Sequence, residues 1–169
     1  ADAEVEFGNV LRLSEQSSGV IVDWELYRDG LPDSEPVAFA QGVDRLIGAS
    51  AGKIKGLWTD RGMDSAANVE KLTSECITNG ICPKSPELLR EKMADSDYAA
   101  GQKRRASTEG RIGIFKNNIM GKRPRNKGFP CRRRAVGWGV LAHNLWVIAR
   151  LPEFDQKAAA ESGESARAA

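Results

Sequence analysis

Short apolar runs alternate with helix-like segments along most of the chain, and this order constrains the fold more than any other feature. Residues 5–13 and 20–27 are typical of two strands, and the turn signal Ser17-Ser18-Gly19 between them indicates a hairpin. The pattern then predicts strands at 54–59 and 77–82 and helices at about 35–48, 65–73, 86–94, 98–118 and 135–150. Strands that alternate with helices indicate an α/β fold, and a hairpin before the first helix makes the sheet mixed.

The second strand and the helix starts supply local detail. In 20–27 the apolar residues alternate with Asp23 and Glu25, so Asp23 is expected to face solvent. Asp33 or Ser34 can cap the first helix, Asp64 or Ser65 the second, and Ser85 the third. The apolar members of the strand are Val20, Val22, Trp24 and Leu26.

A length of 169 residues suggests one domain, at 1–152, followed by a loose Ala-, Ser-, Gly- and Glu-rich tail at 153–169. No stretch is apolar for long enough to span a membrane, and the acidic start does not resemble a signal peptide. Three cysteines in no metal-like spacing and a single histidine, His143, make a zinc site improbable. His143 is expected to form a hydrogen bond within the last helix, and the compartment is expected to be the reducing cytoplasm.

The charge is distributed very unevenly, although its net value is only +2. Residues 1–50 carry ten acids and three bases, whereas residues 103–150 carry thirteen bases and one acid, Glu109. Such an excess favours a polyanionic partner, above all nucleic acid, over a merely solvated basic surface.

Two carboxylates are distinguished by their context. Asp60 ends an apolar strand, where loops and sites are commonly built, and Glu109 stands alone among bases on the helix predicted at 98–118. Spacings of three, four and seven residues place Gln102, Arg105, Glu109 and Lys116 on roughly one helix face. Arg105 is close enough to Glu109 for an ion pair. Taken alone, Arg105 and Glu109 also fit an ordinary ion pair on a helix surface, and Asp60 also fits an ordinary turn or cap residue.

The chain resembles the DDE transposases of bacterial insertion sequences. Residues 59–68 are similar to the segment around the second catalytic aspartate of that family, and residues 104–118 to its third acidic segment. The family commonly shows Tyr, two residues, Arg, three residues, Glu, six residues and Lys, which Arg105, Glu109 and Lys116 match. Gln102 occupies the Tyr position, which departs from the family. The similarity covers nearly all of 4–152 and includes the closing run 142–152.

The resemblance implies a ribonuclease-H-like core of the retroviral-integrase type and Mg²⁺-dependent cleavage and strand transfer at transposon ends. Asp60 and Glu109 would be catalytic metal ligands for two Mg²⁺ or Mn²⁺ ions, which suits the preference of hard cations for carboxylates. Arg105 and Lys116 would bind DNA phosphates. Further phosphate contacts are expected along the basic segment, from Arg123, Arg125, Lys127, Arg132, Arg133 and Arg134. Double-stranded DNA, a homo-oligomer and a bacterial, nucleoid-associated location follow from the same resemblance.

The family also has a first aspartate, on a central strand that precedes the hairpin. Here that strand is expected upstream of Ala1, so the chain reads as an N-terminally truncated or split transposase with weak metal binding and little cleavage of its own. Asp23 is a disfavoured substitute because it lies on the strand that matches the family's third strand. Asp64 is expected to cap a helix, with a role beside the site as the alternative.

Two other functions remain open. The basic segment 103–134 alone fits a non-catalytic DNA-binding remnant. A ribonuclease-H-like repair nuclease is the third alternative, and the Arg-Glu-Lys spacing argues against it. The four tryptophans, Trp24, Trp58, Trp138 and Trp146, are expected in the core or at an interface rather than as base-stacking platforms.

Overall fold

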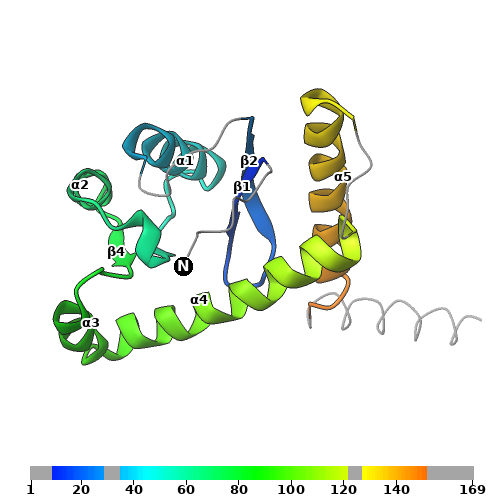
Figure 1. Ribbon diagram of the computed structural model, residues 1–169. Helices are drawn as coiled ribbons and strands as arrows, with labels where there is room; N and C mark the ends of the chain where they lie inside the picture. The colour runs from blue at the N-terminus through cyan, green and yellow to red at the C-terminus, as the bar shows by residue number, and fades with distance from the viewer. Residues whose placement is uncertain (1–8, 29–34, 122–126, 152–169) are drawn as a thin grey trace, which may run out of the picture. The chain divides into compact units, whose positions relative to one another are not determined.

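A computed structural model describes residues 9–28, 35–121 and 127–151, which form a mixed α/β structure (Figure 1). Contacts within the chain divide it into two compact units. Among the described residues, the first unit holds 9–13, 22–28 and 35–111, and the second holds 14–21, 112–121 and 127–151. The expected tail at 153–169 lies outside the described residues, as do Arg123 and Arg125.

The predicted hairpin is present as β1 (Val10–Glu15) and β2 (Ile21–Tyr27). Gly19 closes the turn with a φ of 88°, a conformation that glycine adopts without strain, and its N–H donates to the Gln16 carbonyl at 2.8 Å. The expected faces of the second strand are only partly correct, because Ile21 is buried whereas Val22 is 41% exposed.

Asp23 does not face solvent as expected. Its carboxylate accepts two hydrogen bonds of 2.9 Å from Arg45 on α1 (Pro36–Ala49), in a bidentate ion pair that leaves the Asp23 side chain only 16% exposed. The hydrogen bond to Asp23 raises the pKa of Arg45 above its ordinary value. Asp23 therefore ties the hairpin to the first helix, within the first unit, and its carboxylate is committed to that contact.

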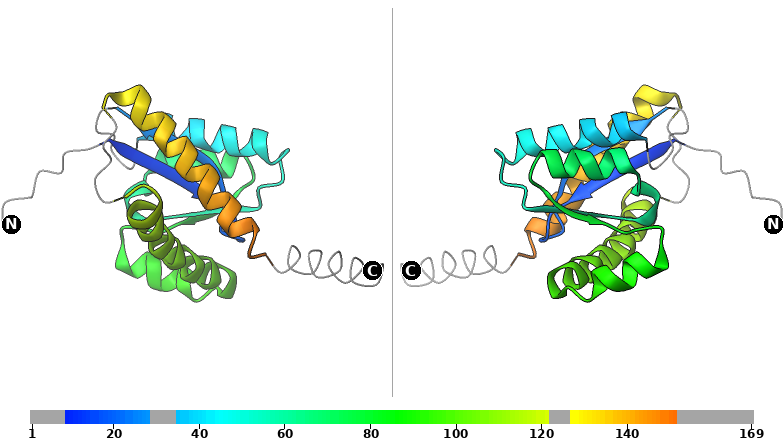
Figure 2. Two further views of the ribbon diagram at one scale, coloured as in Figure 1. Left: turned by 90° about the vertical axis from the view of Figure 1, so that its right-hand side faces the viewer. Right: turned by 90° about the vertical axis from the view of Figure 1, so that its left-hand side faces the viewer.

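A second small sheet lies in the first unit. It consists of β3 (Gly56–Thr59) and β4 (Thr78–Ile81), which run parallel with Trp58 opposite Gly80. The intervening α2 (Ala66–Ser74) lies beside α1 (Figure 2). Among the described strands, β3 pairs only with β4, and the hairpin forms its own two-stranded sheet.

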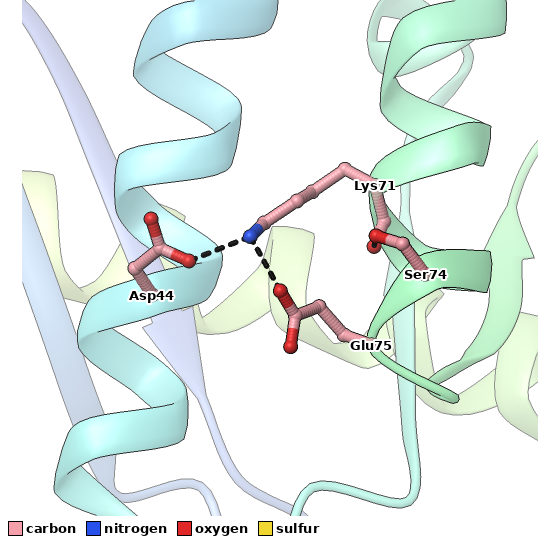
Figure 3. A network of polar contacts seen from close by, with 4 residues as sticks. All are labelled: Asp44, Lys71, Ser74 and Glu75. Carbon is pink, nitrogen blue, oxygen red and sulfur yellow. Dashed lines mark hydrogen bonds and ion pairs between the residues drawn. The ribbon is translucent and has the colours of Figure 1, made fainter.

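The apolar core of the first unit lies between this sheet and the two helices. Phe39 and Val43 of α1 and Leu72 of α2 are buried with Ile81 of β4, and Leu57 of β3 packs against them. On the surface above, the Lys71 ammonium contacts Asp44 and Glu75, each at 2.7 Å (Figure 3). Hydrogen bonds to the two carboxylates raise the pKa of Lys71. This network links α2 to α1.

The expected serine caps are found at two helices. Ser65 caps α2 through Asn68 N–H, and Ser85 caps α3 (Pro86–Met93) through Leu88 N–H, each at 3.3 Å. At α1 the cap is Glu35, whose side chain accepts from Val37 N–H. The expected caps Asp33 and Ser34 lie outside the described residues.

The two long helices differ from their predicted bounds. α4 spans Ser96–Ile114 and gives way to a π-helical segment, η2 (Phe115–Ile119), where a continuous helix to 118 was predicted. α5 spans Phe129–Ile148 and so begins six residues before the predicted start at 135. Pro130 stands in its first turn, where a missing N–H costs nothing, and Arg132, Arg133 and Arg134 therefore lie on a helix and not in a loop.

The second unit is built on α5. Gly139 lets η2 approach the helix closely, since a Cβ at this position would lie 2.7 Å from the Met120 sulfur. His143 is buried and its Nε2 lies 3.1 Å from the Gly19 carbonyl oxygen, so the expectation of a bond within its own helix is wrong. The neighbouring Asn144 donates to the Ile21 carbonyl and accepts from the Ile21 N–H, both at 2.8 Å. These side chains fix the hairpin turn to α5.

In the described parts of the chain, no helix combines the length and the apolar character needed to cross a membrane.

Candidate active site and nucleic-acid interface

Asp60 directly follows β3, as expected from the sequence. Its backbone is extended, with φ −73° and ψ 177°, and leads into a short 3₁₀ turn, η1 (Arg61–Met63). The carboxylate is exposed and forms no capping hydrogen bond with that turn. It therefore stands at the carboxyl end of a strand, accessible to a ligand.

Asp64 does not cap α2, because Ser65 does so. The Asp64 carboxylate instead accepts the backbone N–H of Lys84 at 2.7 Å. This bond joins the loop after β3 to the loop after β4, so that Asp64 stabilises the edge of the sheet at which Asp60 lies.

Trp58 brings α4 against the face of the sheet opposite the helical core. A Cβ built on Gly101 of α4 would lie 1.9 Å from Trp58 Nε1, and one on Gly80 would lie 2.5 Å from the same ring. Only glycine at these positions allows the indole to lie between strand and helix. The helix that carries Glu109 is thus held directly on the strand that precedes Asp60.

Two side chains of α4 reinforce this contact with hydrogen bonds to β4. Tyr98 Oη donates to the Ile81 carbonyl at 3.0 Å, and Gln102 Nε2 donates to the Gly80 carbonyl at 2.7 Å. Gln102 Nε2 also lies 3.1 Å from Tyr98 Oη. Burial raises the pKa of Tyr98, against a smaller lowering by its hydrogen bond with Gln102. The start of α4 is therefore fixed in position and in rotation.

Gln102 continues the hydrogen bonding toward the candidate catalytic acid. Its Oε1 accepts from Arg105 Nε at 3.1 Å, and Arg105 Nη1 donates to Glu109 Oε1 at 3.0 Å. The predicted Arg105–Glu109 ion pair is confirmed, as is the common face of these three residues. The buried role of Gln102 was not predicted, because no local sequence pattern distinguishes it from an exposed helix residue.

The electrostatics of the Arg105–Glu109 pair are those of a surface pair. Glu109 is 69% exposed, so the pair contributes only about 0.2–0.5 kcal/mol to stability. The pair serves mainly to orient the Glu109 carboxylate, because buried Gln102 holds Arg105 from its other side. The Glu109 carboxylate keeps most of its surface for a further ligand.

The two candidate carboxylates are the kind of ligand that a divalent cation prefers, but they are fewer than a complete site needs. Asp60 and Glu109 both offer accessible carboxylate oxygens, the ligands that Mg²⁺ and Mn²⁺ prefer. Within the described residues, no three acidic, histidine or cysteine side chains gather as a metal cluster.

The basic residues are exposed on three elements. Lys103 and Arg104 directly precede Arg105 on α4, while Lys116 lies on η2 in the second unit. Lys127 precedes α5, and the exposed Arg132, Arg133 and Arg134 occupy its first turns. Positive charge at a helix N-terminus interacts unfavourably with the helix dipole, so these arginines do not stabilise α5. Their exposed side chains suit contact with an anion.

Comparisons with models of known families, with curated proteins and with solved structures found no match to the chain.

Proposed function

We propose that the chain carries part of the active site of a DDE-type DNA transposase, with a ribonuclease-H-like core. The observation that carries the proposal is the arrangement around α4. Gly101 and Gln102 hold this helix on the β3–β4 sheet, and Asp60 directly follows β3. The same helix presents the oriented Arg105–Glu109 pair. Two accessible carboxylates on adjoining elements, beside an arginine, suit phosphodiester chemistry.

In this proposal each residue has a defined task. Asp60 and Glu109 hold divalent cations, which when bound supply charge neutralisation and an activated nucleophile for attack on phosphorus. Arg105 orients Glu109 and offers its remaining N–H groups to a phosphate oxygen. Lys116, Lys127 and the arginines of α5 contact the DNA backbone.

The proposed site takes a third carboxylate, which we place on a strand beside β3. Among the described strands, only one edge of β3 is paired. We place this third carboxylate at the end of a strand that pairs with the other edge, parallel to β3, so that its last residues lie beside Asp60. Because the described residues supply only two of the proposed carboxylates, we expect the purified chain to cleave DNA weakly.

Nicking of supercoiled plasmid DNA in the presence of Mg²⁺ or Mn²⁺ tests the proposal. The purified chain is expected to nick slowly, and Glu109→Gln and Asp60→Asn are each expected to lower the rate at least about tenfold while leaving DNA binding intact. Glu87→Gln, on an exposed position of α3, is the matched control. Undiminished nicking by Glu109→Gln would reject the catalytic assignment.

A non-catalytic DNA-binding protein is the second candidate. The lack of a three-acid cluster among the described residues and the exposed arginines at the start of α5 favour it. Binding that weakens steeply with salt, without metal-dependent nicking by the wild-type chain, is the result expected from this alternative.

A further inference from the structure

The helix α5 has two apolar faces, of which only one is covered. Val136, Val140, His143 and Val147 are buried within the second unit. On the opposite side, about 160° around the helix, lies a second row at spacings of three, four and three residues. Its exposed fractions are 70% for Trp138, 46% for Leu141, 60% for Leu145 and 37% for Ile148. We name these four residues the outer seam.

The spacing of the outer seam is that of a helix-pairing surface. Apolar residues alternating at three and four positions are the a and d residues of a coiled coil, which pack against an equivalent row on a facing helix. A single exposed leucine needs no explanation, but a continuous exposed row with a tryptophan does. The pattern therefore indicates another helix as the partner.

We propose that the outer seam binds the outer seam of a second copy of this chain, with the two α5 helices antiparallel. In that arrangement Leu141 packs against Leu145 of the second copy, and Trp138 packs against Ile148 of the second copy. A two-fold axis near residue 143 generates both contacts twice, as in the isologous interfaces of most homodimers. The inference goes beyond the proposed function and does not depend on it.

Charge decides the orientation. Arg134 continues the outer seam one turn before Trp138, and α5 contains no acidic residue. Parallel helices would place the two Arg134 side chains against each other, whereas antiparallel helices separate them by more than the length of the seam. The Arg150 guanidinium, near the other end, lies over the Trp146 ring at 4.1 Å, away from the seam.

The exposed area of the outer seam is small for a protein–protein interface. A buried aromatic side chain covers about 150–250 Å² and each of the three aliphatic side chains exposes less, so two seams bury on the order of 1,000 Å². This is the lower limit of specific interfaces. A reversible dimer with a micromolar dissociation constant is therefore expected.

Sedimentation equilibrium of the full chain tests the pairing. The wild type is expected to dimerise in the micromolar range, and Leu145→Glu is expected to weaken dimerisation at least about tenfold because it places an unpaired charge in the interface. Leu88→Glu, which adds the same charge at a comparably exposed leucine of α3, is expected to leave it unchanged. A monomeric wild type, or a Leu145→Glu variant that dimerises normally, would overturn the proposal.

Cysteine cross-linking tests the orientation and shows which surface is used. With Cys76 and Cys131 replaced by serine, a mixture of Leu141→Cys and Leu145→Cys chains is expected to form a disulfide between the two variants. Either variant alone is expected to cross-link poorly. Efficient cross-linking of Leu145→Cys with itself would overturn the antiparallel arrangement.

Discussion

At the scale of single residues, Gln102 is the side chain on which the geometry of α4 depends. It is buried, and three hydrogen bonds join it to the Gly80 carbonyl, the Tyr98 hydroxyl and the Arg105 guanidinium. It therefore connects the backbone of β4 to the Arg105–Glu109 pair. A residue that departs from the transposase pattern thus has a clear structural task and is too buried for a direct DNA contact.

Gln102→Leu is expected to destabilise the chain by about 1–3 kcal/mol, because a side chain of similar size leaves buried polar groups without partners. The free energy of unfolding in urea measures the effect. Lys103→Leu, at the neighbouring exposed position, is the control and is expected to lie within about 0.5 kcal/mol of the wild type. Equal stabilities of the two variants would show that the Gln102 hydrogen bonds do not matter.

Tyr98 makes stability depend on pH. Its pKa is raised in the folded chain, so the folded state retains the hydroxyl proton at pH values at which the unfolded chain loses it. Its contribution is complete below the ordinary tyrosine pKa of about 10 and is lost as the pH rises through the higher folded value. Tyr98→Phe is expected to flatten the alkaline fall of the urea midpoint. An identical fall in the variant would contradict this assignment.

At the scale of elements, one side chain of the second unit makes the two backbone hydrogen bonds that a neighbouring strand would otherwise make. Asn144 exchanges two 2.8 Å hydrogen bonds with the backbone of Ile21, using the amide as a second peptide group. His143, in the preceding position, binds the Gly19 carbonyl. The turn of the hairpin is thereby attached to α5 by adjacent residues.

Asn144→Leu is expected to cost about 1–3 kcal/mol, because the Ile21 N–H and carbonyl lose their partners in a partly buried place. Asn144→Asp should also destabilise, since a carboxylate cannot donate to the Ile21 carbonyl. Thermal unfolding of both variants measures this. Increased hydrogen exchange at the Ile21 amide would locate the damage at the turn, and an unchanged rate there would argue against the contact.

Helices and strands were predictable where the sequence contains a signal that acts over a few neighbouring residues. The strand before Asp60 and the serine caps at Ser65 and Ser85 were predictable because strand patterns and capping residues act over a few positions. The contacts of Gln102 with Gly80 and of Asn144 with Ile21 were not predictable, because each joins residues more than twenty positions apart and either side chain also suits an exposed helix surface. The start of α5 was predicted too late because a glycine and three arginines in this segment are also typical of a loop.

At the scale of the whole molecule, the main property is the separation of charge along the chain. The acidic first fifty residues and the basic residues 103–150 give a small net charge, so only the local excess can attract a polyanion. In the described residues, the exposed arginines at the start of α5 concentrate that excess on one helical end.

Replacing Arg132, Arg133 and Arg134 together by alanine is expected to weaken binding to duplex DNA of any sequence. Each lost phosphate contact lowers the slope of log affinity against log salt by roughly one, so a reduction of about two to three is expected. Fluorescence anisotropy over a salt series measures the slope. A control that removes three exposed lysines elsewhere, at 53, 55 and 84, is expected to change it by less than about one. Equal slopes for the two triple variants would place the DNA contact elsewhere.

The indole of Trp58 fits because three positions far apart in the sequence, Gly56, Gly80 and Gly101, lack a side chain. An enlargement at any of them is tolerated only if the ring at position 58 shrinks at the same time. Evolution of this contact therefore requires paired changes, and across homologous sequences positions 58 and 101 should vary together or not at all.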